Sequence, residues 1–443
     1  MKMNTHSLSM LAASLLSAVA IALTGCANGS SNPLAATQAA QAKNAGNFTT
    51  TIFLGDSLTA GYQSASLLDT QQVNGWAPLV ATQAKFNITL PLIAPPGAPS
   101  VLQLVTIHPL VITTAPGTTI GRDNFATQPT NLAVPGATLN DVANTVPLIT
   151  PTTAQQQINQ LVLGYPGLGY GQAYSQATTA IKANPTTIFL WIGNNDALIA
   201  DFTGTPSSMT PTATFTTQYQ ALINQLSTQT TAHLVIGNIS DVTSIPYLQP
   251  AAGLLAQYST GTGLSVATLS ALLGITTGDF VNQAGLAQIP MILAGTQKTP
   301  ISDAGFLSAA EVVTVKAQVA TYNQIIATQA TAVGATLVDI NALFTQIATS
   351  GLTINGYTGT TAFLGGVFSL DGVHPSNTGY AVVANKFIDS MNAAIKTSIP
   401  DANLVPIAAA DPLWPVNLAH HADVPNQLIP QNVLRSAEGL FVK

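Results

Sequence analysis

Four short runs of apolar and β-branched residues, widely separated along the chain, restrict the fold more than any other feature of the sequence. They are Thr49–Gly55, Thr186–Gly193, Ala232–Ile239 and Ala335–Ile340. Each run is apolar at both odd and even positions, as expected of a strand that is buried on both faces. Strands of this kind belong to parallel sheets that helices cover on two sides.

Helical segments separate these strands. Phe215–Gln229 and Ala309–Val333 have the length and the apolar spacing of helices. A last helix is indicated after His374, where five apolar residues fall on one helical face: Tyr380, Val383, Phe387, Met391 and Ile395. The alternation of strands and helices predicts an α/β fold, a three-layer α/β/α sandwich with a mostly parallel central sheet.

The predicted domain covers residues 48–398 and contains two insertions. The first, at about 67–130, is too rich in proline for a regular helix, and the second, at about 240–304, includes one possible helix. Insertions between sheet elements usually form loops or lids near a site, and we expect the same of these two. Residues 399–443 are again rich in proline and are expected to form an irregular tail.

The first 25 residues have the features of a secretory signal: an early lysine, an apolar run at Leu8–Leu23, and the small pair Thr24-Gly25. The single cysteine of the chain, Cys26, follows directly. This arrangement resembles a bacterial lipobox, in which Cys26 carries the lipid and residues 26–47 form a tether. An ordinary signal peptide with an incidental cysteine is the alternative.

The expected location is therefore the cell envelope, through a lipid anchor, or the external medium after secretion. Residue 27 is alanine rather than aspartate, a pattern that resembles lipoproteins sent on to the outer membrane. Beyond the N-terminus no apolar run approaches the roughly 20 residues needed to cross a bilayer. Only 6% of the residues are charged and the net charge is −6, so the chain lacks the basic surface that a nucleic-acid partner requires.

Reactive side chains follow the predicted strands. Ser57 stands in "GDSL" directly after the first strand, and Asn195 stands in "GNND" after the second. Ligands of open α/β sheets collect at this carboxyl edge. Gly136 lies in a loop after an apolar stretch, where its N–H group is open to a substrate oxygen. Asp371 and His374 lie three residues apart in "DGVH", just before the last helix.

Each of these residues also has a purely structural interpretation. Ser57 is compatible with a simple helix cap, and the Asp371–His374 pair with a surface turn. Gly136 is compatible with an ordinary turn glycine, and Asn195 with a turn in which its side chain binds its own backbone. For the two neighbouring acids, Asp56 and Asp196, we predict support of loop geometry rather than chemistry.

Taken together and in this order, the four blocks resemble the SGNH (GDSL-type) hydrolase family over about Thr49 to Asn392. The resemblance implies that Ser57 is the nucleophile, His374 the general base and Asp371 the residue that orients the imidazole. It implies an oxyanion hole made by the N–H groups of Ser57 and Gly136 and the side-chain amide of Asn195. It implies neither a metal nor a cofactor.

The function expected from this resemblance is that of a serine esterase or lipase that passes through an acyl-enzyme. Its substrate would be a small-molecule or lipid ester, and its contact with the membrane would be the N-terminal lipid anchor. Two alternatives remain open. One is removal of acetyl groups from carbohydrate, and the other is a lipid-anchored binding protein without turnover.

Overall fold

The computed structural model describes residues 46–107, 109–118 and 120–419. Its centre is a parallel sheet of four strands in the order β1-β4-β5-β9. The strands are β1 (Thr51–Gly55), β4 (Thr187–Trp191), β5 (His233–Gly237) and β9 (Thr336–Val338). Every residue of β1, β4 and β5 is buried, which explains why these runs are apolar at both parities. All four predicted strands are present, and each is shorter than the predicted run.

A further segment extends the sheet beyond β1. The backbone from Thr130 to Val134 runs parallel to β1, with Phe53 donating to Thr130 O (2.9 Å), Leu132 donating to Phe53 O (2.9 Å) and Val134 donating to Gly55 O (3.2 Å). The sequence predicts only a loop after an apolar stretch here. Because the pairing is short, the segment carries little periodicity of its own, yet it leads directly into the loop of Gly136.

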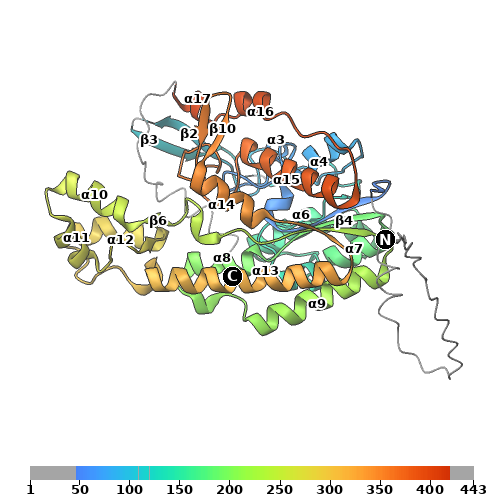
Figure 1. Ribbon diagram of the computed structural model, residues 1–443, viewed down its shortest axis with the longest axis horizontal. Helices are drawn as coiled ribbons and strands as arrows, with labels where there is room; N and C mark the ends of the chain where they lie inside the picture. The colour runs from blue at the N-terminus through green and yellow to red at the C-terminus, as the bar shows by residue number, and fades with distance from the viewer. Residues whose placement is uncertain (1–45, 108, 119, 420–443) are drawn as a thin grey trace, which may run out of the picture.

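Helices cover both faces of the sheet (Figure 1). One layer contains α4 (Trp76–Ala84), α14 (Ile340–Ser350) and α15 (Asn377–Ile395). The opposite layer contains α5 (Leu139–Asn144), α6 (Ala154–Leu163), α7 (Gln176–Lys182), α8 (Asn194–Thr203), α9 (Thr212–Gln229) and α13 (Ala309–Ala332). The predicted three-layer α/β/α sandwich is confirmed, and the predicted helices at 215–229 and 309–333 correspond to α9 and α13.

An aromatic cluster joins the sheet to the first helical layer. Trp76 of α4 stacks on Phe387 of α15 with ring centroids 4.0 Å apart, and it meets Trp191 of β4 edge-on at 6.1 Å. Both tryptophans and Phe387 are fully buried. Phe387 belongs to the helical face predicted from the sequence, and its neighbours on that face, Tyr380 and Met391, are buried as well.

Replacement of Trp76 by alanine is expected to reduce the free energy of unfolding by about 3–5 kcal/mol, the usual cost of truncating a fully buried aromatic residue. The large cavity would lie between α4, α15 and β4. Denaturant unfolding measures the loss. The matched control is Tyr170→Ala, because this side chain is 79% exposed and its removal should change stability by about 0.5 kcal/mol or less. Equal stabilities of the two variants would contradict the assigned core.

The first predicted insertion, 67–130, differs from the prediction. It contains α3 (Asp69–Gln72), α4 and the hairpin of β2 (Leu102–Ile107) and β3 (Leu110–Thr114). Its first third is therefore part of the helical layer rather than a loop or lid. The prediction was wrong here because the prolines after residue 90 were taken to describe the whole stretch, whereas Trp76–Ala84 has only one proline, in its first turn, where a helix tolerates it.

The second insertion forms a lobe that projects from one end of the molecule (Figure 1). Its small sheet contains β6 (Gln249–Pro250), β7 (Phe280–Val281) and β8 (Phe306–Leu307). Its helices are α10 (Ala251–Thr262), α11 (Val266–Leu273) and α12 (Gln283–Leu293), three helices where the sequence indicated one. Asn282 ties the lobe to the main body by donating from Nδ2 to the carbonyl oxygen of Asp201 in α8 at 3.0 Å.

The C-terminal part of the described chain lies against α15. It contains α16 (Leu404–Ala410) and α17 (Pro415–Ala419), and Asp411 between them accepts a hydrogen bond from Thr378 N at 2.8 Å. A hairpin of β10 (Leu352–Ile354) and β11 (Tyr357–Gly359) lies nearby. The predicted signal, the lipidation site Cys26, almost all of the tether and residues 420–443 of the tail lie outside the described residues. Within those residues, no helix is long and apolar enough to cross a membrane.

Candidate active site

Ser57 stands at the junction of the first strand and a short helix. β1 ends at Gly55, and α2 (Ser57–Ala60) begins at Ser57. Asp56 caps this helix by accepting a hydrogen bond from Leu58 N at 3.0 Å. The cap is therefore Asp56 and not Ser57, whose hydroxyl is directed elsewhere. This removes the structural alternative in which Ser57 serves only as a helix cap.

Close packing holds the strand end in place. The side-chain amide of Gln176 pairs with both backbone groups of Gly55, accepting from its N–H at 3.0 Å and donating to its carbonyl at 2.9 Å. A Cβ atom on Gly55 would lie 2.5 Å from the carbonyl oxygen of Trp191, so only glycine fits. The contacts with Gln176 and Trp191 thus fix the end of β1, and with it the position of Ser57 two residues later.

Three side chains from opposite ends of the sequence form one chain of hydrogen bonds. The Nε2 atom of His374 lies 2.8 Å from the hydroxyl of Ser57, and its Nδ1 atom lies 2.9 Å from Oδ2 of Asp371. All three side chains are buried, with His374 and Asp371 at 0% exposure. Such a series is able to pass a proton from the serine to the imidazole while the carboxylate stabilises the charged ring. A surface turn, the structural alternative for this pair, is excluded by the burial.

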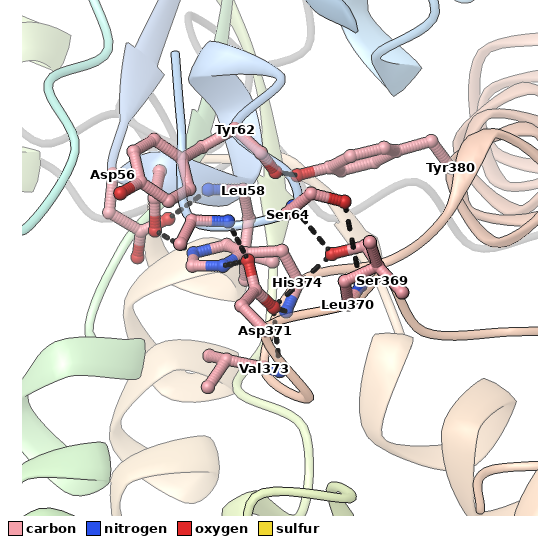
Figure 2. Close-up of polar contacts among 12 residues, drawn as sticks. Asp56, Leu58, Tyr62, Ser64, Ser369, Leu370, Asp371, Val373, His374 and Tyr380 are labelled. Carbon is pink, nitrogen blue, oxygen red and sulfur yellow. Dashed lines mark hydrogen bonds and ion pairs between the residues drawn. The ribbon is translucent and has the colours of Figure 1, made fainter. Parts of the chain in front are cut away.

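Asp371 is held as a carboxylate by donors on all sides (Figure 2). Its Oδ1 atom accepts from the backbone N–H groups of Val373 and His374, both at 2.9 Å, and its Oδ2 atom accepts from Ala65 N at 2.7 Å. Burial by itself would raise the pKa of Asp371. The charge of His374 and these hydrogen bonds outweigh burial and leave the pKa below its ordinary value.

The segment after Ser57 supports the aspartate. Ser64 and Ala65 adopt left-handed backbone conformations with φ of 50° and 58°, and Ala65 donates its N–H to Asp371. Ser64 N donates to the hydroxyl of Ser369 (2.8 Å), which donates in turn to Asp371 Oδ1 (3.2 Å). These contacts, seen in Figure 2, bind the first sequence block to the last. Left-handed conformations cost non-glycine residues roughly 1–2 kcal/mol each, which marks the loop as shaped for this contact.

Two aromatic residues close the other side of the imidazole. The ring of Tyr62 lies 4.7 Å from that of His374, centroid to centroid. Tyr380 of α15 donates its hydroxyl to the carbonyl oxygen of Tyr62 at 2.6 Å. Both tyrosines are fully buried, so the side of the ring that Tyr62 covers is shielded from water.

The three donors predicted for the oxyanion hole are the N–H groups of Ser57 and Gly136 and the side-chain amide of Asn195. Among the described residues, the N–H groups of Ser57 and Gly136 donate to no other protein group. Gly136 has a φ of 76°. Before Gly136, the loop is held by the hydrogen bond from Val134 N to Gly55 O, and after it by a contact with Asn195. Asn195 donates from Nδ2 to Ala137 O at 2.8 Å, which uses one of its two amide hydrogens. Its side chain therefore joins the first turn of α8 to the loop of Gly136 and does not form a turn with its own backbone.

The neighbouring acids Asp56 and Asp196 are fully paired. Asp56 accepts from Asn194 Nδ2 at 3.0 Å in addition to Leu58 N, and Asp196 accepts from Leu139 N at 2.8 Å and from the hydroxyl of Thr210 at 2.7 Å. These contacts hold loops together, in agreement with the role predicted for both acids. Burial raises the pKa of Asp56 and of Asp196 to about 6, and their hydrogen bonds offset only part of that effect.

The raised pKa of Asp56 leads to a prediction about stability and pH. Because its pKa in the folded protein exceeds the unfolded value of 3.8, the folded state binds more protons between these two values. The contribution of Asp56 to stability is therefore complete below the unfolded pKa and is lost as the pH rises through about 6. We expect Asp56→Asn to remove about 1 kcal/mol of the change in unfolding free energy between about pH 5 and pH 7.

The asparagine variant keeps an acceptor for Leu58 N, and Asn194 has an Oδ1 atom without a partner among the described residues that can accept from the new amide. Urea unfolding of the wild type and the variant at both pH values measures the difference. Equal pH dependence of the two proteins would disprove the assignment.

A cavity opens beside Ser57, and His374, Asn194 and Asn195 also line it. Its partly exposed lining residues are Leu58, Ser240, Asp241 and Ser244, which therefore stand at its mouth. The buried apolar part of the lining consists of Leu198, Val242, Ile245, Phe344, Phe368 and Val373. The serine hydroxyl thus faces a small space with an apolar floor.

Several of the supporting residues were not foreseen from the sequence. Ala65 acts through its backbone N–H, and no residue type marks such a donor. Gln176 and Ser369 are ordinary polar residues whose partners lie 121 and 305 residues away, so only the folded chain identifies them. The described residues include no group of three or more histidine, cysteine, aspartate or glutamate side chains placed to hold a metal.

A parallel sheet between two helical layers, with a Ser–His–Asp series at its carboxyl edge, is an arrangement used by serine-dependent hydrolases of the α/β class. The chain belongs to the family described as GDSL-like Lipase/Acylhydrolase, whose model matches residues 52–387. The resemblance predicted from the four sequence blocks is confirmed by this match. By family, the protein is a hydrolase.

No curated protein matches the chain. Among solved structures, it is similar to LAE5, described as an alpha/beta hydrolase enzyme from the metagenome of Lake Arreo, Spain, with 11% sequence identity and a TM-score of 0.35. The likeness covers 79% of this chain and 99% of that one, but a score so low supports no inference.

Proposed function

We propose that the protein is a carboxylic ester hydrolase in which Ser57, His374 and Asp371 form a catalytic triad. The observation that carries the proposal is the pair of contacts made by His374, 2.8 Å to the hydroxyl of Ser57 and 2.9 Å to Asp371. Family membership supports the hydrolase class. The substrate would be a small-molecule or lipid ester.

In the first half of the reaction, the Ser57 oxygen attacks the ester carbonyl while its proton moves to Nε2 of His374. The tetrahedral intermediate then collapses, the bond to the alcohol oxygen breaks, and His374 returns the proton to that oxygen. The products are a free alcohol and an acyl group on Ser57. In the second half a water molecule repeats the same steps and releases the acid.

The negative oxygen of each intermediate would be held by the N–H groups of Ser57 and Gly136 and by the amide of Asn195. The absence of protein acceptors for these two N–H groups, among the described residues, supports this role. Ser57 also starts α2, so its N–H points out of the helix end. Loss of one such donor typically lowers kcat by about 10²–10³.

Labelling with a fluorophosphonate tests the proposal directly. This probe reacts with activated serine hydroxyls, so we expect a single covalent adduct, located at Ser57 by mass spectrometry of the digested protein. The same preparation should hydrolyse p-nitrophenyl esters and lose that activity when labelled. An unlabelled Ser57 in folded protein would favour the alternative of a binding protein without turnover.

We also propose that the enzyme is held at the bacterial envelope, by a lipid on Cys26. The proposal rests on the signal-like residues 1–25 and on the position of the single cysteine. Expression with a radioactive or alkyne-tagged fatty acid should label the wild type, and Cys26→Ser should abolish the label and release the protein from membranes. Equal labelling of both proteins would exclude Cys26 as the anchor.

A further inference from the structure

We infer that the active site selects short acyl groups, of about two to four carbons, and that Phe344 sets this limit. The inference rests on the proposed ester hydrolysis at Ser57. It narrows the substrate class from lipases in general to esterases that act on short-chain esters, such as acetyl esters.

The size of the cavity is the first argument. The space open to the centres of water molecules is about 40 Å³. A single water needs roughly 10–15 Å³ of such space, so the cavity has room for about three waters, which matches an acyl group of a few heavy atoms. A chain of eight or more carbons would need several times this volume.

The lining residues at the two ends of the cavity differ in polarity, and this difference indicates which part of the ester binds at each end. The floor is formed by buried apolar side chains, whereas Ser240, Asp241 and Ser244 stand at the mouth. Asp241 also binds Lys316 at 3.2 Å, so the mouth carries a charged pair. An apolar acyl group gains by entering the floor, and a polar alcohol gains by remaining at the mouth.

Two phenylalanines form part of the floor. Phe344 and Phe368 lie with ring centroids 5.6 Å apart, and each is only 5% exposed. Phe368 belongs to the segment that carries Asp371 and His374, and Ser369 N donates to His374 O at 2.7 Å beside it. Phe344 comes from the separate helix α14. It is therefore the member of the pair whose truncation leaves the supports of the triad in place.

A second, larger cavity in the protein does not provide additional room for a longer acyl chain on Ser57. A cavity of about 310 Å³ lies between β2, α3 and the C-terminal segment around Leu413, and Ser64 and Leu370 also line it. Its lining shares no residue with the cavity beside Ser57. An acyl chain bound to Ser57 would therefore be confined to the cavity that Phe344 helps to line.

The experiment compares kcat/KM for p-nitrophenyl acetate, butyrate, hexanoate and octanoate. For the wild type we expect the highest values with acetate and butyrate and a decrease of at least about tenfold from butyrate to octanoate. Phe344→Ala should raise the octanoate-to-acetate ratio by about tenfold or more, and Phe344→Leu, which disturbs the helix less, should raise it by a smaller factor. A new preference for long chains cannot arise from partial unfolding.

Leu343→Ala is the matched control, because Leu343 is adjacent in α14 and packs on the core without lining the cavity. It should leave the ratio unchanged. A wild type that prefers octanoate and loses all activity in Ser57→Ala would overturn the short-chain limit but not the hydrolase. An unchanged ratio in both Phe344 variants would overturn the role of that residue, and a wild type inactive on every ester would overturn both proposals.

Discussion

Replacement of Ser57 by alanine is expected to lower kcat for ester hydrolysis by about 10⁴-fold or more. The Ser57 hydroxyl bonds only to Nε2 of His374, and no other hydroxyl lies in that position among the described residues. Without it, water attack assisted by the remaining donors is the only route to product. Initial rates with p-nitrophenyl butyrate measure the effect, and KM should change far less than kcat because the cavity is unaltered.

The folded state of this variant should remain intact, since the substitution removes one oxygen and no packing atom. Circular dichroism and the urea midpoint provide that check. Ser350→Ala, at the exposed end of α14, is the control for a serine substitution and should retain full activity. Hydrolysis at the wild-type rate in folded Ser57→Ala protein would end the assignment of this residue as the nucleophile.

Substitution of Asp371 by asparagine is expected to reduce kcat by about 10⁴-fold, although the shape of the side chain is preserved. The amide can still accept from Val373 N and His374 N. Its NH₂ group, however, would face Nδ1 of His374, and the ring would then carry its proton on Nε2. A histidine in that state cannot accept the proton of Ser57.

The same change should also destabilise the fold, because Ala65 N would lose its acceptor inside the protein. A buried N–H group without a partner costs about 1–3 kcal/mol. Asp389→Asn, at an exposed position of α15, is the matched control and should change neither quantity. Initial rates and urea unfolding of both variants measure the changes in kcat and in stability. An Asp371→Asn enzyme with normal kcat would show that the imidazole needs no carboxylate.

The order of strands and helices was accessible to sequence analysis because each element carries its own signal. Phe53 and Phe189 lie in runs whose residues are all buried, and such runs are recognisable without knowledge of their partners. Tyr380, Phe387 and Met391 recur at helical spacing and lie in α15. These signals were strong enough to locate the sheet and the helices around it.

Elements with weak local signals were missed or misassigned. The pairing of Thr130–Val134 with β1 is too short to show alternation, and α4 was obscured by the prolines that follow it. The three helices of the projecting lobe occur in a sequence of small and uncharged residues, where a single helix was expected. In each case tertiary contacts stabilise an element that its own residues specify poorly.

By itself, the sequence determined the class of fold and the residue types able to do chemistry, since periodicity and reactive groups are properties of a few neighbouring positions. Only the tertiary structure decided that Ser57 and His374, 317 residues apart, meet at 2.8 Å. It also decided that Ala65 donates to Asp371 and that Phe344 lines the cavity beside Ser57. Distances and volumes of this kind result from the packing of whole layers against one another, and no local pattern of residues contains that information.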